Sequence, residues 1–402
     1  MLTKFIRSIY NLLGAYLIGG PKGMLQHLIY FRKRGKSIIG TENPYGYLLD
    51  PKYGKSLYDN KDKSIKTLNW FMMDMGTNGG GDINIFRYIN GLSELGFRNN
   101  VYITHFCKHN TREDLTKYIT KYYGDVKADF FLPTDLVQPA DGAVATEWRT
   151  AYVVKKLDNV KAKFYFIQDY EPYFFPKSSE YELAKNTYTF GFNGITAGYW
   201  LRDKIAKDFD MKTHGFTFTY EKDSYKVIPE VKRNPKKIFF YSRPVTPRRA
   251  FELGMLALSK LHELDPSIEI VLAGWDSLNY ELDFPHENLG ILKVSELPEV
   301  YSSCQLGLVL SLTNCSLLPT ELLACGCVPV INQGANNEWL VEDKVNGILI
   351  DTDPENIAKT LKHYIDNPKE VETIRNKGMK LIGKTTYKTE FKKVAEFINS
   401  QI

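Results

Sequence analysis

A short loop after one apolar run of the chain combines carboxylates with aromatic rings. The run Phe164–Ile167 is typical of a buried strand, and it is followed closely by Asp169, Tyr170, Glu171, Tyr173 and Phe174. Aromatic rings pack on sugar faces, and carboxylates accept hydrogen bonds or protons from hydroxyl groups. The loop therefore predicts a carbohydrate site with Asp169, Tyr170 and Glu171; a capped surface loop is the structural alternative. Glu147, beside an aromatic residue after another predicted strand, is assigned to the same site.

A glycine-rich loop follows the first predicted strand and opens a helix. It contains Gly79, Gly80, Gly81 and Asp82. Glycines let backbone N–H groups approach a ligand, and a helix N-terminus favours an anion. The loop is not a P-loop, because no Gly-Lys-Ser/Thr follows it. The pattern allows a ligand-binding loop, which the family resemblance given below places at the reaction centre; a plain tight turn, with Asp82 as the helix N-cap, is the alternative.

Two arginines lie between a predicted strand and a predicted helix in the second half of the chain. Arg243 follows the strand Ile238–Tyr241, and Arg248 begins the helical pattern Arg248–Leu264. A helix start that faces only water favours acidic residues, so cations there indicate an anionic ligand. Because a guanidinium can hold a phosphate through two hydrogen bonds, we expect Arg243 and Arg248 to bind a diphosphate.

A third polar segment follows the predicted strand Gln305–Leu312 and contains Asn314, Ser316 and Glu321. Glu321 falls at the start of a predicted helix, Thr320–Cys325, where it could cap the helix or accept hydrogen bonds from the vicinal hydroxyls of a ribose. The Asp-x-Asp tripeptides Asp208–Asp210 and Asp351–Asp353 end a helix and start a surface loop, and the histidines are scattered. We therefore predict no metal site.

The elements that carry these loops alternate from Thr67 onward, as in a doubly wound parallel α/β sheet. The first half has predicted strands at 68–73, 100–106, 141–146, 163–168 and 195–198, and predicted helices at 83–95, 149–157, 179–190 and 199–209. A polar segment with two prolines, Tyr220–Lys237, is typical of a linker, after which the alternation restarts. Two Rossmann-like domains facing a cleft are predicted, and ligands of such sheets bind at the carboxyl ends of the strands. We set the boundaries at 1–50 for an N-terminal arm, 51–222 and 223–385 for the two domains, and 386–402 for a C-terminal helix.

Charge is unevenly distributed over the 402 residues, whose net charge is +5. Residues 1–41 hold seven Lys and Arg and no acidic residue, so the rest of the chain is slightly acidic. This excludes a nucleic-acid-binding body. Five cysteines without disulfide or zinc spacing favour a reducing cytoplasm.

The N-terminal arm is amphipathic as well as basic. Its longest uncharged apolar run, Leu12–Gly20, is far shorter than the ~20 residues of a membrane-spanning helix. An apolar face beside basic residues is typical of a helix that lies on anionic lipid. We therefore expect residues 1–36 to hold the protein peripherally on the inner face of the plasma membrane. An arm packed on the protein itself or on a second subunit of a homodimer is the alternative.

Together these motifs resemble the GT-B glycosyltransferases of family 4, and within them the WsaF-type rhamnosyltransferases of bacterial polysaccharide assembly. The resemblance covers about Thr67–Asn367 and rests on four segments: Asn69–Arg87, Phe164–Phe192, Phe240–Gly254 and Ser311–Glu321. It implies a metal-independent transfer without a cofactor and with retention at the anomeric carbon. It also implies that the first domain, which carries Asp169, Tyr170 and Glu171, binds the acceptor and that the second binds the nucleotide-sugar donor.

The resemblance assigns roles to individual residues. Arg243 and Arg248 would neutralise the departing diphosphate, Glu321 would hold the donor ribose or sugar, and Gly274 and Trp275 would lie against the base. Asp169 is the first candidate for a catalytic base. The chain departs from the family pattern at two positions: Thr313 replaces the first of two glutamates spaced eight residues apart, and Asp82 stands where a histidine is expected.

The predicted function is transfer of L-rhamnose from dTDP-L-rhamnose to a lipid-linked glycan. Two alternatives stay open. A GT-B nucleotide-sugar epimerase would need neither an acceptor nor a membrane arm, and a degenerate transferase would only bind glycan as a scaffold.

Overall fold

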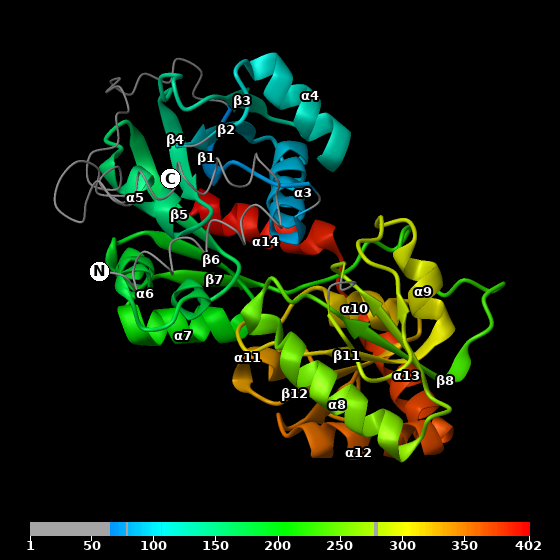
Figure 1. The fold of residues 1–402 in the computed structure, drawn as a ribbon. Coiled ribbons are helices and arrows are strands. Elements are labelled where there is room, and N and C mark those ends of the chain that lie inside the picture. The colour runs from blue at the N-terminus through cyan, green and yellow to red at the C-terminus, as the bar shows by residue number, and fades with distance from the viewer. Residues whose placement is uncertain (1–64, 78, 106, 277–279) are drawn as a thin grey trace, which may run out of the picture. The chain divides into compact units, whose positions relative to one another are not determined.

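The computed structural model describes residues 65–402 except 78, 106 and 277–279 (Figure 1). The amphipathic arm predicted for residues 1–50 lies outside the described residues, and so does its expected contact with a membrane or a second subunit. Within the described part of the chain, no helix combines the length and the apolar character needed to cross a bilayer.

The first domain is built on a seven-stranded parallel sheet in the order β3-β2-β1-β4-β5-β6-β7. Its strands are β1 (Thr67–Met73), β2 (Arg98–Thr104), β3 (Asp129–Phe131), β4 (Ala140–Ala145), β5 (Val160–Ile167), β6 (Asn193–Ala197) and β7 (Thr213–Phe216). The helices of this half are α3 (Gly80–Glu94), α4 (Arg112–Tyr123), α5 (Trp148–Lys156), α6 (Ser179–Asn186) and α7 (Tyr199–Phe209). Short 3₁₀ turns follow β5 (η1, Glu171–Phe174) and α6 (η2, Thr187–Thr189).

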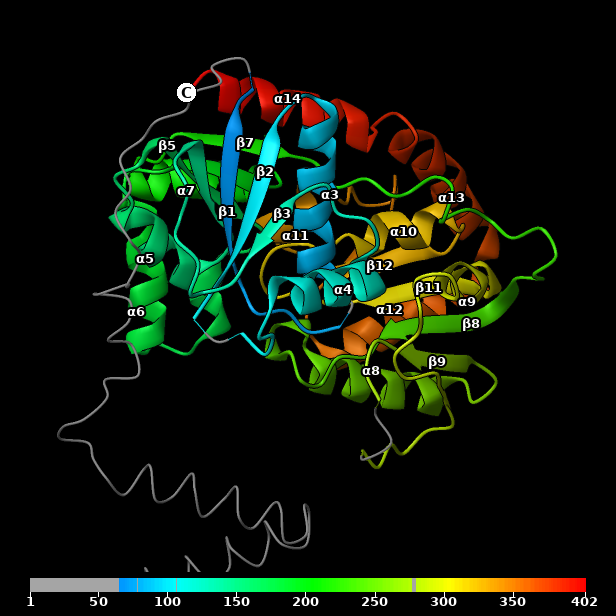
Figure 2. The same ribbon diagram turned by 90° about the horizontal axis from the view of Figure 1, so that it is seen from above.

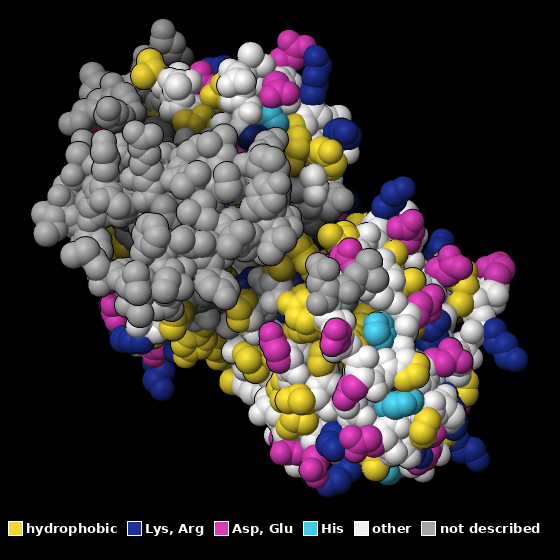
Figure 3. Space-filling view, viewed as in Figure 1, with side chains coloured by type: hydrophobic (Ala, Val, Ile, Leu, Met, Phe, Trp, Pro, Cys, Tyr) yellow, Lys and Arg dark blue, Asp and Glu magenta, His cyan; other side chains and the backbone are white. Residues whose placement is uncertain are grey.

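The second domain has a six-stranded parallel sheet in the order β10-β9-β8-β11-β12-β13. Its strands are β8 (Asn234–Tyr241), β9 (Glu269–Ala273), β10 (Glu287–Asn288), β11 (Cys304–Val309), β12 (Val328–Asn332) and β13 (Ile348–Ile350). The helical elements are the 3₁₀ turn η3 (Pro247–Arg249), α8 (Phe251–Leu264), α9 (Leu297–Ser303), α10 (Leu318–Ala324), α11 (Ala335–Glu338), α12 (Pro354–Asp366) and α13 (Pro368–Ile382). Figure 3 shows acidic and basic side chains interspersed over the face of this domain that the view presents.

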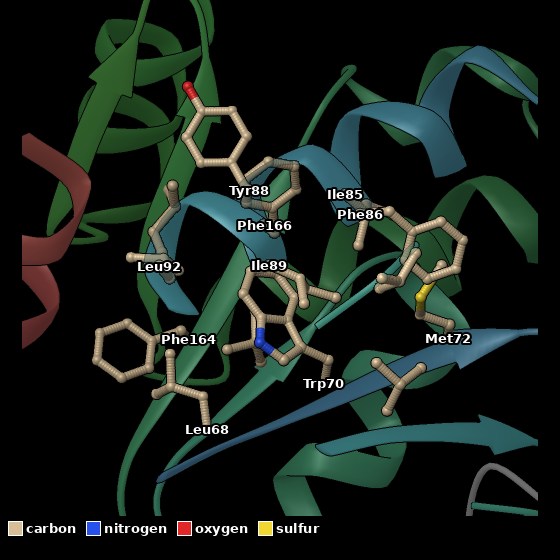
Figure 4. Packing of buried hydrophobic residues seen from close by; sticks show 14 of the residues in the cluster. Leu68, Trp70, Met72, Ile85, Phe86, Tyr88, Ile89, Leu92, Phe164 and Phe166 are labelled. Carbon is tan, nitrogen blue, oxygen red and sulfur yellow. The ribbon is translucent and has the colours of Figure 1, made fainter. Parts of the chain in front are cut away.

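The strands of the first domain lie in its core. Their sequences are continuous apolar runs, because parallel strands that are covered on both faces bury nearly every side chain. Trp70 of β1 packs edge-on against Phe166 of β5, with ring centroids 5.8 Å apart, and Tyr88 of α3 lies on the same ring (Figure 4). The indole of Trp70 donates a 2.8 Å hydrogen bond to the Asn99 amide oxygen, so its polar atom is satisfied inside the core.

The last helix, α14 (Tyr387–Asn399), returns to the first domain and lies beside α3 (Figure 2). Val394 and Ile398 belong to the first domain's core, and the buried Glu390 carboxylate accepts a hydrogen bond from the Thr217 backbone. A Cβ on Gly91 of α3 would lie 2.1 Å from the Phe391 ring, so glycine is what allows this close approach.

The prediction of two Rossmann-like parallel-sheet domains is confirmed. Several short elements were missed, among them α4, β3, β7 and β13. The predicted linker, Tyr220–Lys237, is too long at its end, because β8 begins at Asn234. The helix predicted to begin at Arg248 begins at Phe251, because Ala250 has a left-handed backbone (φ 47°) that separates η3 from α8.

Candidate active site

Asp169 lies where the loops at the carboxyl ends of the two sheets meet. It follows β5 of the first domain, and its side chain is only 10% exposed. One carboxylate oxygen accepts hydrogen bonds from the Tyr170 and Asn314 backbone N–H groups, both at 2.8 Å. The other accepts a 2.7 Å bond from the Thr313 hydroxyl. The predicted base is therefore the carboxylate that links the first domain to the loop after β11.

Asn314 adds further contacts between the domains, and both polar atoms of its side chain form hydrogen bonds with protein groups. Its amide nitrogen donates to the backbone oxygens of Gln168 and Ala197 in the first domain, at 3.0 and 2.7 Å. Its amide oxygen accepts a 3.1 Å bond from the Trp339 indole. We expected Asn314 to bind the donor, but in this structure its side chain bridges the domains instead.

The two predicted diphosphate ligands are held differently. Arg243 is held within its own domain, since its Nε donates to the Thr246 hydroxyl at 3.1 Å and one Nη to the Tyr241 hydroxyl at 3.3 Å. Arg248 is held by the first domain: its Nε lies 3.3 Å from the Asp169 carboxylate, and its guanidinium carbon lies 4.1 Å from the Phe174 ring centroid. Burial lowers the pKa of Arg248, and the Asp169 charge opposes this effect.

Glu321 stands in the first turn of α10, as predicted. Burial raises the pKa of its carboxyl to about 7, while the Arg87 charge and a hydrogen bond from the Tyr225 hydroxyl act in the opposite direction. Arg87 comes from α3 of the first domain, where it pairs with Glu221 at 2.8 Å and lies 4.2 Å from the Tyr387 ring centroid. One Nη of Arg87 is buried without a hydrogen-bond partner among the described residues.

The glycine loop is tied to β5 and to α4. Gln168 donates to the Gly81 backbone oxygen at 3.1 Å and accepts from the Asn84 amide at 3.0 Å. The Tyr123 hydroxyl donates to the Gly76 oxygen at 2.7 Å and also lies 3.3 Å from the Asp82 carboxylate.

Gly79, and not Asp82, is the N-cap of α3. A Cβ on Gly79 would lie 2.5 Å from an Asp82 side-chain oxygen, whereas a Cβ on Gly80 would have no heavy atom within 4 Å. Burial raises the pKa of Asp82 to about 6.

Three residues that were predicted to face the acceptor glycan, Glu171, Tyr170 and Glu147, form contacts within the first domain instead. Glu171 is 4% exposed and accepts hydrogen bonds from the Trp148 backbone at 2.6 Å and the Tyr165 hydroxyl at 2.8 Å. Tyr170 is 3% exposed and stacks on Tyr188. Glu147 forms a capping box with Thr150 at the start of α5. Glu171 and Tyr170, which were predicted to face an acceptor, lie inside the first domain in this structure, because η1 folds them inward.

The other residues predicted to bind the donor lie beyond the carboxyl ends of the strands in the second sheet. Gly274 follows β9 with φ 124°, and a Cβ there would lie 2.7 Å from the Tyr241 ring. Trp275 beside it is half-buried. The Ser316 hydroxyl, just before α10, is buried and has no hydrogen-bond partner among the described residues.

Sequence reasoning missed Arg87, Gln168, Tyr225 and Trp339 as parts of the site. Their partners lie far away in the chain, and Tyr225 was taken for linker. The described residues hold no group of three or more His, Cys, Asp or Glu arranged to bind a metal ion.

Comparison with known proteins decides the family. The family description "WsaF, C-terminal domain" matches residues 236–362, and "WsaF, N-terminal domain" matches residues 108–197, together just over half of the chain. The chain belongs to the WsaF family of GT-B glycosyltransferases. The resemblance to WsaF-type enzymes seen in the sequence motifs is thus confirmed.

A curated relative and two solved structures extend this assignment. O-antigen biosynthesis protein RfbC of Myxococcus xanthus is 30% identical over 263 residues, which are 64% of this chain but 21% of that protein's length. Anabaena HepE, solved with UDP and glucose, aligns with a TM-score of 0.66 at 15% identity over 83% of this chain and 100% of its own. TarM aligns with a TM-score of 0.67 at 10% identity over 83% of this chain and 99% of its own. At such identities these structures establish the fold that this WsaF-family chain shares with them.

Proposed function

We propose that this WsaF-family chain transfers a sugar from a nucleoside-diphosphate sugar to a hydroxyl group of a glycan in surface polysaccharide synthesis. The observation that carries the proposal is the Arg248 guanidinium. It is fixed at its Nε and on one face, and among the described residues neither Nη nitrogen has a hydrogen-bond partner. A guanidinium held in this way presents two parallel N–H donors, which match two oxygens of a phosphate.

The arginines act on the leaving group. The bond between the anomeric carbon and the β-phosphate oxygen breaks, and the acceptor oxygen bonds to that carbon. The acceptor proton passes to a departing phosphate oxygen, so the charge balance needs no metal. Arg243 and Arg248 stabilise the negative charge that develops on the diphosphate, an electrostatic contribution that grows toward the transition state.

Other residues bind the donor and the acceptor. Ionised Glu321 accepts hydrogen bonds from the ribose hydroxyls, Ser316 contributes a free hydroxyl, and Trp275 lies against the base. The open backbone at Gly80 admits the acceptor, beside Gly81, which lies against the Gln168 amide. Asp169 holds the Thr313 loop and Arg248 in place.

The donor we propose is dTDP-L-rhamnose and the acceptor a lipid-linked glycan. Two comparisons support a surface polysaccharide product and a nucleotide-sugar donor: the RfbC relative is named for O-antigen biosynthesis, and HepE was solved with UDP and glucose. The basic arm, residues 1–36, would hold the enzyme on the inner face of the plasma membrane near this acceptor. Replacing Arg32, Lys33 and Arg34 by Glu should then move the full-length chain from the membrane fraction to the supernatant.

The deciding experiment is calorimetric titration of the protein with dTDP-L-rhamnose, UDP-glucose, UDP-N-acetylglucosamine and GDP-mannose. We expect saturable binding of the dTDP donor, lost in Arg248→Ala and retained in Arg202→Ala, whose guanidinium pairs with Asp203 on α7. Preference for another donor would overturn the rhamnose assignment alone. A folded chain that binds none of the four would be a glycan-binding scaffold, the alternative that Thr313 suggests. Donor epimerisation without any acceptor would point to the epimerase.

A further inference from the structure

Phe174 connects the first domain to the donor arginine. Its ring is 37% exposed, at the end of η1, and the guanidinium carbon of Arg248 lies 4.1 Å from the ring centroid. The Arg248 side chain is 30% exposed, although it ends beside an aromatic ring and a carboxylate. An aromatic face attracts a guanidinium, and the attraction is larger where the cation is partly desolvated.

The second constraint on Arg248 is Asp169. The carboxylate lies 3.3 Å from Nε, yet this nitrogen has no hydrogen bond of good geometry, so the contact is an ion pair. The hydrogen bonds that Asp169 accepts from Thr313, Asn314 and Tyr170 spread its negative charge over protein donors. The carboxylate thus fixes the inner edge of the guanidinium, and the outer edge, with both Nη nitrogens, stays available.

The backbone of Arg248 is also anchored. Its carbonyl oxygen accepts a 2.9 Å hydrogen bond from the Leu312 N–H, one residue before Thr313. This bond joins the loops after β8 and β11 within the second domain, whereas the Arg248 side chain contacts the first domain.

We propose that Phe174 is a positioning residue for the donor diphosphate: by stacking on Arg248, the acceptor domain aims the arginine of the donor domain at the leaving group. The inference rests on the proposed function. It means that the diphosphate site is complete only when η1 of the first domain covers η3 of the second. Arg243 needs no such help, because its two hydrogen bonds come from Tyr241 and Thr246 in its own domain.

The test is titration of UDP, dTDP and the preferred nucleotide sugar into the wild type and into three Phe174 variants. Phe174→Ala and Phe174→Leu remove the aromatic face, and Phe174→Tyr keeps it. An attraction of about 1–2 kcal/mol corresponds to roughly 5- to 30-fold in affinity. We therefore expect Ala and Leu to weaken binding of the nucleoside diphosphates by about that factor, and Tyr to restore it.

Two controls separate positioning from general damage. Tyr173→Ala changes the neighbouring aromatic residue of η1, which is 46% exposed and packs on Tyr170, and it should leave nucleotide affinity unchanged. In an Arg248→Met background, Phe174→Ala should have no further effect, because the two residues act through one contact.

Other outcomes would overturn the inference. If Phe174→Ala weakens binding of the nucleotide sugar but not of free UDP or dTDP, the ring is a platform for the sugar and not a support for Arg248. If the wild type and Phe174→Leu bind the nucleotides with equal affinity, the aromatic ring does not position Arg248. The proposed function would be unaffected by this result. A wild type that binds no nucleotide would reject the proposed function and this inference together.

Discussion

Two carboxylates of the candidate site are used in opposite ways. At the first, which we call the Asp169 junction, the carboxylate oxygens accept three hydrogen bonds from protein groups and pair with Arg248. At the second, which we call the Arg87 junction, burial raises the pKa of Glu321 to about 7, while the Arg87 charge and the Tyr225 hydroxyl act in the opposite direction. The first carboxylate is occupied in holding the protein together, whereas the proposed function gives the second to the donor.

The Asp169 junction should show the largest loss of activity. Asp169→Asn keeps the size of the side chain but removes the charge beside Arg248 and turns one acceptor into a donor facing the Thr313 hydroxyl. Removing a buried carboxylate charge that accepts hydrogen bonds and pairs with a cation costs about 2–5 kcal/mol. We expect kcat/KM for transfer to fall by roughly 100-fold or more. Asp208→Asn, which changes a pair with Lys204 on the α7 surface, is the matched control.

Circular dichroism and thermal unfolding must accompany this assay. A folded Asp169→Asn protein with full activity would mean that the junction does not organise the donor site.

The second carboxylate of the same loop, Glu171, is expected to have a structural role. Glu171→Ala leaves the Trp148 N–H and the Tyr165 hydroxyl without their buried acceptor, at a cost of about 1–3 kcal/mol for each unsatisfied group. Urea unfolding should show a free energy of unfolding lower by roughly 2–4 kcal/mol. Activity per folded molecule, measured at low temperature, should stay within about threefold; a stable but inactive variant would return Glu171 to the reaction centre.

Glu321 should give the Arg87 junction a pH dependence. Because the pKa of the folded state is raised from the ordinary 4.5 to about 7, the native state binds the extra proton between these values. The stability that this proton brings is complete below about pH 4.5 and is lost as pH rises through about 7. Donor affinity should change in the other direction, rising from about pH 6 to about pH 8 as the carboxylate forms.

Glu321→Gln provides the comparison. It should bind the donor weakly with a flat pH profile and, at pH 8, unfold at a higher temperature than the wild type. An unchanged pH profile in this variant would assign the titration to another group.

Arg87 should produce the smallest effect. Its charge lowers the pKa of Glu321, so Arg87→Met should move the midpoint of the pH-dependent donor binding to a higher pH. The control is Arg98→Met, which removes an exposed pair with Asp129 at the start of β2. If the midpoint of donor binding does not change, Arg87 contacts Glu221 and Tyr387 but does not influence the titration of Glu321.

The sequence was most informative where local pattern and tertiary environment agree. Apolar runs such as Phe164–Ile167 became buried parallel strands, because both faces of such strands are covered. Arg243 and Arg248 were found from their place after a strand. Short edge strands such as β3 and β13 were missed because three residues carry no periodicity.

The site could be predicted only in part, because side-chain direction depends on distant partners. Within one loop, Asp169 turns to the second domain, while Glu171 turns inward onto Tyr165, and no local spacing separates the two. Arg87 meets Glu221 across 134 positions of the chain, a contact that only the folded domains create.

Sugar transfer itself tests the central claim most directly. The protein would be incubated with each of the four labelled nucleotide sugars and a lipid extract of the source cells, and label would be counted in the organic phase. We predict that the wild type moves label from dTDP-L-rhamnose into this phase, that Arg248→Met does not, and that Arg202→Met does. A folded wild type that transfers label from none of the four donors, while releasing no nucleoside diphosphate, would contradict the account.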